Sequence, residues 1–176
     1  MEKVEFLILR NLLHNEDYAR KVIPFIKKDY FEDVHQQIIF EETSSFLQEY
    51  NQLVTTEILS IEIERRTDIN GDSFSSLVDI INQLNDDPVD HDWLLDTTEK
   101  WCRDRAIYLA LMDSINIADG GDEKRGRDAI PSILSEALSV SFANHIGHDY
   151  LQPLYYTNLT LHTTTPVDNS VDHVPI

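Results

Sequence analysis

Apolar residues recur every three or four positions along most of this chain, and that period predicts α-helices. The clearest case covers residues 73–84, where the spacing is i, i+3, i+4, i+7 and i+10 for Phe74, Leu77, Val78, Ile81 and Leu84. A long helix is predicted from about Asp92 to Ile117, with acidic residues left for solvent and an apolar set made of Leu94, Leu95, Trp101, Leu109 and Met112. A stripe near the N-terminus predicts one more helix through Phe6, Leu9 and Leu13.

Three further segments complete the predicted body. A helix is expected over residues 18–26, with a kink or a break at Pro24, which has no backbone N–H to donate. Another is expected within residues 29–51, where one face carries Val34, Ile38, Phe46 and Tyr50. Residues 57–66 follow a helix-start residue, Thr55, although a strand is the competing prediction because of the alternation of Leu59, Ile61 and Ile63. The sequence therefore predicts an all-α fold with a compact body of about six helices.

Composition changes along the chain and suggests where the body ends. Residues 1–118 form the predicted helical domain, and residues 119–128, DGGDEKRGRD, predict a flexible charged linker. Residues 129–150 hold a short amphipathic helix whose apolar positions are Ile130, Ile133, Leu134, Ala137 and Leu138. Such a helix on a tether must bury its apolar face, so docking on another subunit or domain is expected. Residues 151–176 are rich in Thr, lack Lys, Arg and Glu, and predict a disordered tail.

The overall composition is that of an ordinary globular protein, with 41% hydrophobic and 26% charged residues among 176. The one cysteine, Cys102, excludes an internal disulfide and a thiolate metal cluster within one chain. No apolar run approaches the roughly 20 residues that span a bilayer. Glu5 and Arg10 bracket the apolar block near the N-terminus and no cleavage site follows, so this block predicts an amphipathic helix and not a signal peptide. No membrane partner is expected.

The net charge is −18, from fourteen basic and thirty-two acidic residues. Affinity for nucleic acid comes mainly from clustered Lys and Arg that neutralise phosphates, so direct DNA binding is not expected. A solvated acidic surface is the simplest interpretation of the charge. The alternative is an independent acidic helical binding protein, either a DNA mimic or a regulator of a basic partner.

Two glycine-containing segments partly match the sequence patterns of ligand-binding loops. Gly121 and Gly126 have the spacing of a phosphate-binding loop, but Arg127 and Asp128 stand where Lys and Ser or Thr are required, so a polar linker is the better interpretation. A calcium loop starting at Asp68 would need glycine where Ser73 lies, which favours a turn. A nearby acidic group could hold a cation but is more typical of caps and turns: Asp86, Asp87, Asp90 and Asp92.

The best candidates for a metal or acid–base site are His145, His148 and Asp149, although no further cluster completes a coordination sphere and Gly147 is typical of a helix end. Cys102 has no base beside it in the sequence and is interpreted as a small buried apolar residue. No nucleophile–base pair is visible. We therefore expect no enzyme activity, no cofactor and no metal in this chain.

Three stretches are distinctive in wording: KVIPFIKKDYFEDVHQQIIF, DDPVDHDWLLDTTEKWCRDRAIYLA, and AIPSILSEALSVSF followed by IGHDY. They resemble the N-terminal region of the replicative DNA helicases of T-even-type bacteriophages, which are DnaB-like hexameric helicases. Together they lie within residues 1–150, in the same order as in the family. The last two stretches are the more specific ones.

The resemblance implies a helical collar that pairs with neighbouring subunits, helps to hold a hexamer and communicates with primase. The helix of residues 92–117 would belong to the hairpin used in pairing, with collar interface positions Leu94, Trp101, Leu109 and Met112. The helix of residues 129–150 would be a linker helix that docks on the motor domain of the adjacent subunit through Ile130, Ile133, Leu134, Ala137 and Leu138. The implied location is the cytoplasm of the infected host cell.

In the resembling helicases, a RecA-like motor domain follows the GHDY region and holds ATP and Mg²⁺. None of its motifs appears in this sequence, and residues 151–176 match nothing expected of the family. A truncated or shifted reading frame, or a split gene, would explain the change. We therefore expect a non-catalytic oligomerisation and docking module whose partners are further copies of the chain, the full-length helicase and primase.

Overall fold

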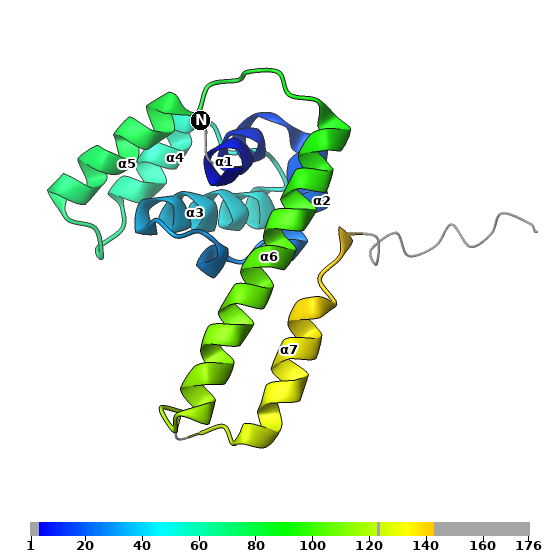
Figure 1. Ribbon diagram of the computed structural model, residues 1–176. Coiled ribbons are helices and arrows are strands. Elements are labelled where there is room, and N and C mark those ends of the chain that lie inside the picture. Colours follow the sequence, from blue (N-terminus) through cyan, green and yellow to red (C-terminus); the bar gives the residue numbers. More distant parts are fainter. Residues whose placement is uncertain (1–3, 123, 143–176) are drawn as a thin grey trace, which may run out of the picture. The chain divides into compact units, whose positions relative to one another are not determined.

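The computed structural model describes residues 4–122 and 124–142, which lie in one compact unit, Met1–His145. Seven α-helices and three short 3₁₀ turns form the regular structure of these residues, and no strand occurs among them (Figure 1). The predicted all-α fold is confirmed. None of the helices described is long and apolar enough to cross a membrane. The tail predicted at residues 151–176 lies outside the described residues.

The first five helices are α1 (Val4–His14), α2 (Glu16–Val22), α3 (Val34–Tyr50), α4 (Thr56–Glu64) and α5 (Gly71–Gln83). The long helix predicted at residues 92–117 is α6 (His91–Ala118), and the short amphipathic helix is α7 (Ile130–Leu138). The three 3₁₀ turns are η1 (Ile23–Phe25), η2 (Lys28–Tyr30) and η3 (Arg127–Ala129).

Short polar side chains fix the starts of these helices by accepting backbone N–H groups of the first turn. The N-caps of α2 to α6 are Asn15, Asp33, Thr55, Asn70 and Asp90. The cap at Thr55 begins a helix where the sequence also allowed a strand, so the strand alternative is wrong. The helix is favoured there because Leu59 and Ile63, one turn apart, are both fully buried.

The second helix begins earlier and ends sooner than the predicted residues 18–26. Asn15 accepts the backbone N–H of Tyr18 at 3.0 Å, which starts α2 at Glu16. Pro24 lies in η1 after the end of α2, because a proline inside a helix removes a hydrogen bond and crowds the preceding turn. The predicted break at Pro24 is therefore confirmed.

Residues 4–101, which we call the head, enclose a core of large side chains. The largest fully buried ones include Ile8, Leu12, Tyr18, Leu59 and Leu77. The Tyr18 hydroxyl lies 2.8 Å from Thr98 Oγ1 on α6, and Thr98 donates to the Leu94 carbonyl at 2.7 Å. Tyr18 is thus the donor to Thr98, and the buried polar groups are paired. The bond from Tyr18 fastens the first half of α6 to α2 within the head.

An ion cluster joins α3 to the segment after α4. The Arg66 guanidinium lies 3.1 Å from Glu41, 2.7 Å from Glu42 and 2.7 Å from Asp68. Its hydrogen bonds hold the pKa of Asp68 and the pKa of Glu41 below their ordinary values. Because Arg66 is about four-fifths buried, this cluster orders the turn that leads into α5.

Candidate functional site

Helix α6 continues beyond the head and a short loop returns the chain into α7, so that the two helices form a hairpin (Figure 1). Two hydrogen bonds show that the helices are antiparallel. Near the loop, Arg127 donates to the Ala118 carbonyl at 2.8 Å. Near the head, Arg103 on α6 donates to the Val140 carbonyl at 3.2 Å. The hairpin is therefore anchored at both ends.

At the level of α7, the buried positions of α6 hold small residues at every fourth position: Cys102, Ala106, Ala110 and Ser114. Small side chains allow two helix axes to approach closely. The Ser114 hydroxyl donates to the Ala110 carbonyl at 2.6 Å, so it brings no unpaired polar group into the contact. This face of α6 is occupied within the chain.

Arginine contacts order the loop of the hairpin. Arg125 binds both carboxylate oxygens of Asp113 at 2.6 Å and Asp122 at 2.7 Å. Asp122 also accepts the backbone N–H groups of Lys124 and Arg125, and these bonds, with the guanidinium, lower its pKa. The contacts are exposed to water and weak individually, so they orient the loop more than they stabilise it.

The opposite face of α6 carries four exposed apolar side chains, which we call the stripe: Tyr108, Leu111, Met112 and Ile115. Their exposed fractions are 52%, 47%, 50% and 55%, and their i, i+3, i+4, i+7 spacing places them on one face. At 100° per residue, this face points away from Ala106 and Ala110. Contiguous exposed apolar side chains mark interaction sites, so the stripe is the strongest candidate site in the described residues.

One edge of the stripe is shaped by Arg105. Its guanidinium lies 5.2 Å from the centre of the Tyr108 ring and donates to Glu32 in the head at 2.9 Å. The same guanidinium therefore covers one side of the Tyr108 ring and pairs with the head. This cation–π contact orients an aromatic side chain that remains half-exposed.

The structure separates the four predicted collar positions. Leu94 is 1% exposed and belongs to the head core. Trp101 packs against Tyr30 and Phe31, with ring centroids 5.9 Å and 5.1 Å away, and Leu109 is half-buried. Met112 alone among the four lies in the stripe. The collar role of these residues stays a prediction.

The predicted linker-helix positions lie along α7. Ala137 is buried, and Ile133 and Leu134 are half-buried against the core, so much of the predicted docking face contacts α6 in this structure. Ile130 is half-buried and Leu138 is 65% exposed. Docking of α7 on another subunit stays a prediction, as do the domain boundaries at residues 118/119 and 128/129.

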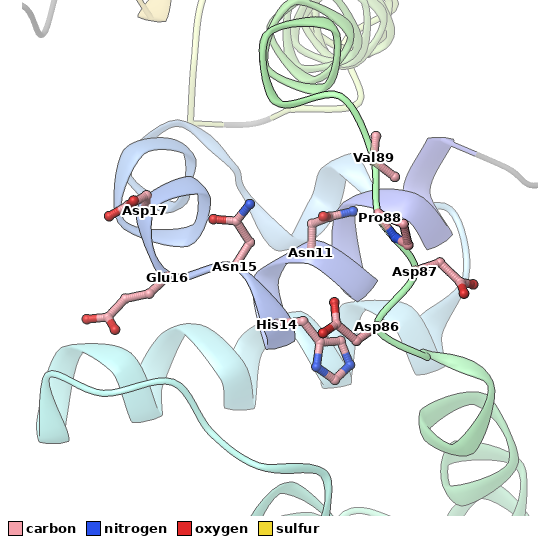
Figure 2. Close-up of a pocket in the computed structure, with 9 residues that line it drawn as sticks. All are labelled: Asn11, His14, Asn15, Glu16, Asp17, Asp86, Asp87, Pro88 and Val89. Atoms are coloured by element: carbon pink, nitrogen blue, oxygen red, sulfur yellow. The ribbon is translucent and has the colours of Figure 1, made fainter.

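A polar groove of about 410 Å³ lies between the α1–α2 turn and residues 86–89 (Figure 2). Its carboxylates are Glu16, Asp17, Asp86 and Asp87. The segment is attached to α1 by His14, whose Nε2 lies 2.7 Å from the Leu84 carbonyl, and by Arg10, 3.3 Å from Asp87. Asp90 caps α6, as the turn-and-cap interpretation predicted. No group of three metal-binding side chains occurs among the described residues.

The segments that partly match a calcium loop and a phosphate-binding loop have structural roles in the fold. Asp68 pairs with Arg66 and Asn70 caps α5, which confirms a turn in place of a calcium loop. In the segment that partly matches a phosphate-binding loop, between Gly121 and Gly126, Asp122 accepts the backbone N–H groups that a bound phosphate would need. Cys102 is 0% exposed, and burial raises the pKa of its thiol to about 12, which keeps it protonated. The predicted site at His145, His148 and Asp149 lies outside the described residues.

Sequence reasoning missed Tyr108, Leu111 and Ile115. The signal was present in the small residues spaced by four, Ala106 and Ala110, which mark the face covered by a neighbouring helix. The apolar residues opposite that face then had no partner within the chain.

No family model matches this chain. It is 31% identical over 153 residues to a DnaB-like replicative helicase of Enterobacteria phage T4, a match that covers 82% of this chain and 32% of that protein. The resemblance to a replicative helicase is confirmed. The chain spans about a third of the length of the helicase it matches, so the similarity concerns one part of that protein.

Proposed function

We propose that this chain is a non-catalytic, self-associating module equivalent to the collar of a DnaB-like replicative helicase. The stripe carries the proposal, because it leaves four large apolar side chains half-exposed on a helix whose other face is covered by α7. The match to part of a replicative helicase also supports it. In this proposal, pairs of chains meet through their stripes and build toward a hexamer, while ATP hydrolysis and DNA unwinding belong to other parts of the assembly.

The size of the stripe limits how strong this contact is. Burying the exposed half of one such side chain contributes about 1 kcal/mol, so two stripes of four contribute about 8 kcal/mol. Lost translational and rotational freedom costs at least about 4 kcal/mol. The balance corresponds to a dissociation constant of about 1 mM from the stripe alone. Stable hexamers would therefore need further surfaces.

Helix α7 is proposed as one of these surfaces. Leu138 is exposed and Ile130 is half-exposed at the edge of the hairpin, where a motor domain of an adjacent subunit would dock. The full-length helicase and primase are the further proposed partners, in the cytoplasm of the infected cell. The proposed module uses no cofactor and leaves DNA contact to other domains, consistent with its net charge of −18.

Sedimentation equilibrium over a concentration series reaching the millimolar range tests the proposal. We expect the apparent mass to rise above the 20.4 kDa of one chain as concentration increases. A mass that stays at 20.4 kDa throughout, together with no binding to helicase or primase, would contradict it.

Charge reversal separates this function from that of an acidic protein with a basic partner. Asp86→Lys and Asp17→Lys change the polar groove and lie outside the stripe. Self-association should survive both substitutions, because the net negative charge falls and the apolar contact is untouched. If the two variants instead lose binding to a basic partner while stripe variants keep it, the acidic-protein alternative is correct.

A further inference from the structure

We infer that residues 140–142 form a latch that controls whether α7 stays on α6 or is released to dock on an adjacent subunit. This inference rests on the proposed docking of α7 and names what regulates it. The same apolar side chains, Ile133, Leu134 and Ala137, cannot contact α6 and another subunit at once. Release of α7 from α6 is therefore a necessary step before they dock.

The apolar part of the latch is Phe142, which follows α7 and returns to the head. Its side chain is 6% exposed, and its ring centroid lies 4.6 Å from that of Phe25 in η1. A buried phenylalanine removes roughly 150–250 Å² of surface from water. Within α7 itself, Ala137 is the one buried residue, so the largest buried side chain of residues 130–142 lies outside the helix.

The polar part of the latch is built on one turn of α6. Glu99 accepts hydrogen bonds from Arg103 Nη2 at 2.8 Å and from Ser141 Oγ at 3.0 Å. Arg103 Nε in turn donates to the Val140 carbonyl at 3.2 Å. Two side chains spaced by four residues on α6 therefore bind both residues that lead to Phe142. Because these side chains are partly exposed, they orient the segment more than they stabilise it.

The opposite end of α7 is attached in a different way. Arg127 donates to the Ala118 carbonyl at 2.8 Å. Arg125 pairs with Asp113 and Asp122. These contacts are exposed to water, and exposed ion pairs contribute little stability. When the latch opens, the chain itself still connects α7 to α6 and keeps their faces at a high effective concentration, so the release is reversible.

Cys102 lies beside the latch and reports whether it is open. It is the one cysteine of the chain, is 0% exposed, and lies three residues from Glu99 and one from Arg103. Burial, and then the nearby Cys102 and Glu136, raises the pKa of Tyr30 to about 12, so α7 and the thiol both lie near Tyr30. A neutral thiol reagent such as iodoacetamide therefore reaches Cys102 only when α7 or the head opens.

Phe142→Ala tests the latch through the rate at which iodoacetamide labels Cys102 in the dilute full chain without urea. We expect labelling at least ~10-fold faster than in the native chain, because the buried ring contact is lost. Phe142→Leu should label at an intermediate rate, since it keeps part of the contact. Leu138→Ala is the matched control, because Leu138 lies four residues earlier and is 65% exposed, and it should label at the native rate.

The dependence of labelling on urea separates release of α7 from unfolding of the head. Release of a short helix exposes little surface, so labelling of Phe142→Ala should change little at low urea, whereas global unfolding depends steeply on urea. Labelling of Phe142→Ala at the native rate, or with the urea dependence of global unfolding, would overturn the inference. If Phe142→Ala loses its helix content by circular dichroism, Phe142→Leu is judged by the same two criteria. The proposed function is tested separately by sedimentation and helicase binding, so the two failures are distinguishable.

Discussion

The buried positions of the head hold large side chains such as Ile8, Leu59 and Leu77, whereas those of α6 beside α7 hold Cys102, Ala106, Ala110 and Ser114. The exposed apolar residues of the two regions also differ, in how they are grouped on the surface. The outer part of α6 exposes the four apolar side chains of the stripe on one face, while exposed large apolar residues of the head are dispersed over α3, α4 and the start of α6.

This difference suggests two levels of stability within one unit. Removing large side chains from water is the main favourable contribution to folding, so the head should set the global free energy of unfolding. The nine-residue α7 buries one alanine and leaves three larger residues, Ile130, Ile133 and Leu134, half-buried, so it should open at lower cost. The hairpin is therefore suited to contacts with other chains, and the head is suited to hold it in place.

The largest expected effect is in the head core. Leu59→Ala leaves a cavity at a fully buried position and should lower the free energy of unfolding by about 2–5 kcal/mol, measured by urea denaturation at fixed protein concentration. Ile61→Ala is the matched control, since Ile61 lies on the same helix and is 47% exposed. Its effect should be below about 1 kcal/mol. Equal losses in both variants would mean that α4 does not contribute to the core in this way.

A smaller effect is expected in the hairpin. Ala110→Leu inserts a large side chain between α6 and α7 and should cost about 1–3 kcal/mol by overpacking. The damage should remain local: hydrogen exchange should accelerate in α7 and stay unchanged in α3 and α4. Exchange that accelerates equally in all three helices would show that the head and the hairpin unfold as one.

The hydrogen bond between α2 and α6 inside the head should contribute less again. Tyr18→Phe removes the hydroxyl that donates to Thr98, while Thr98 keeps its bond to the Leu94 carbonyl. The free energy of unfolding should fall by about 1 kcal/mol. Thr98→Val removes both the bond from Tyr18 and the bond to the Leu94 carbonyl, so it should lower the free energy of unfolding by more in the same urea titration. A larger loss for Tyr18→Phe than for Thr98→Val would contradict the assigned donor.

The smallest effect concerns acid. Arg66 lowers the pKa of Asp68 and of Glu41 in the folded chain relative to the unfolded one, so the stability it contributes is complete above the unfolded pKa and is lost as pH falls through the folded pKa. Arg66→Gln should therefore be less stable than the native chain at neutral pH, and the difference should shrink below about pH 4. Urea titrations at several pH values measure this. A difference that is constant with pH would exclude these carboxylates as its source.

Much of the fold could be predicted from local patterns. The spacing of Phe74, Leu77 and Ile81 predicted α5, and the apolar positions after Asp92 predicted α6 within one residue at each end. These predictions succeeded because helical period and capping are local properties of the chain. Pro24 likewise marked the end of α2 through its own geometry.

The candidate site was less predictable, because it depends on which face of a helix is covered by another segment. The apolar positions of α7 were expected to contact another subunit, yet in the structure three of them contact α6: Ile133, Leu134 and Ala137. That contact in turn leaves Tyr108 and Ile115 on the exposed side. The apolar period of one helix does not say which segment covers each of its faces. That is decided by the tertiary packing, here by α7, which runs antiparallel to α6 and covers one face of it.

The central claim is that the stripe, and not general acidity or exposed apolar surface elsewhere, brings copies of this chain together. Met112→Glu and Ile61→Glu add the same charge at apolar positions that are 50% and 47% exposed, one in the stripe and one in the head. Sedimentation velocity at equal high concentrations should show association of the native chain and of Ile61→Glu, and a monomer for Met112→Glu. Association of Met112→Glu as strong as that of the native chain would contradict the account.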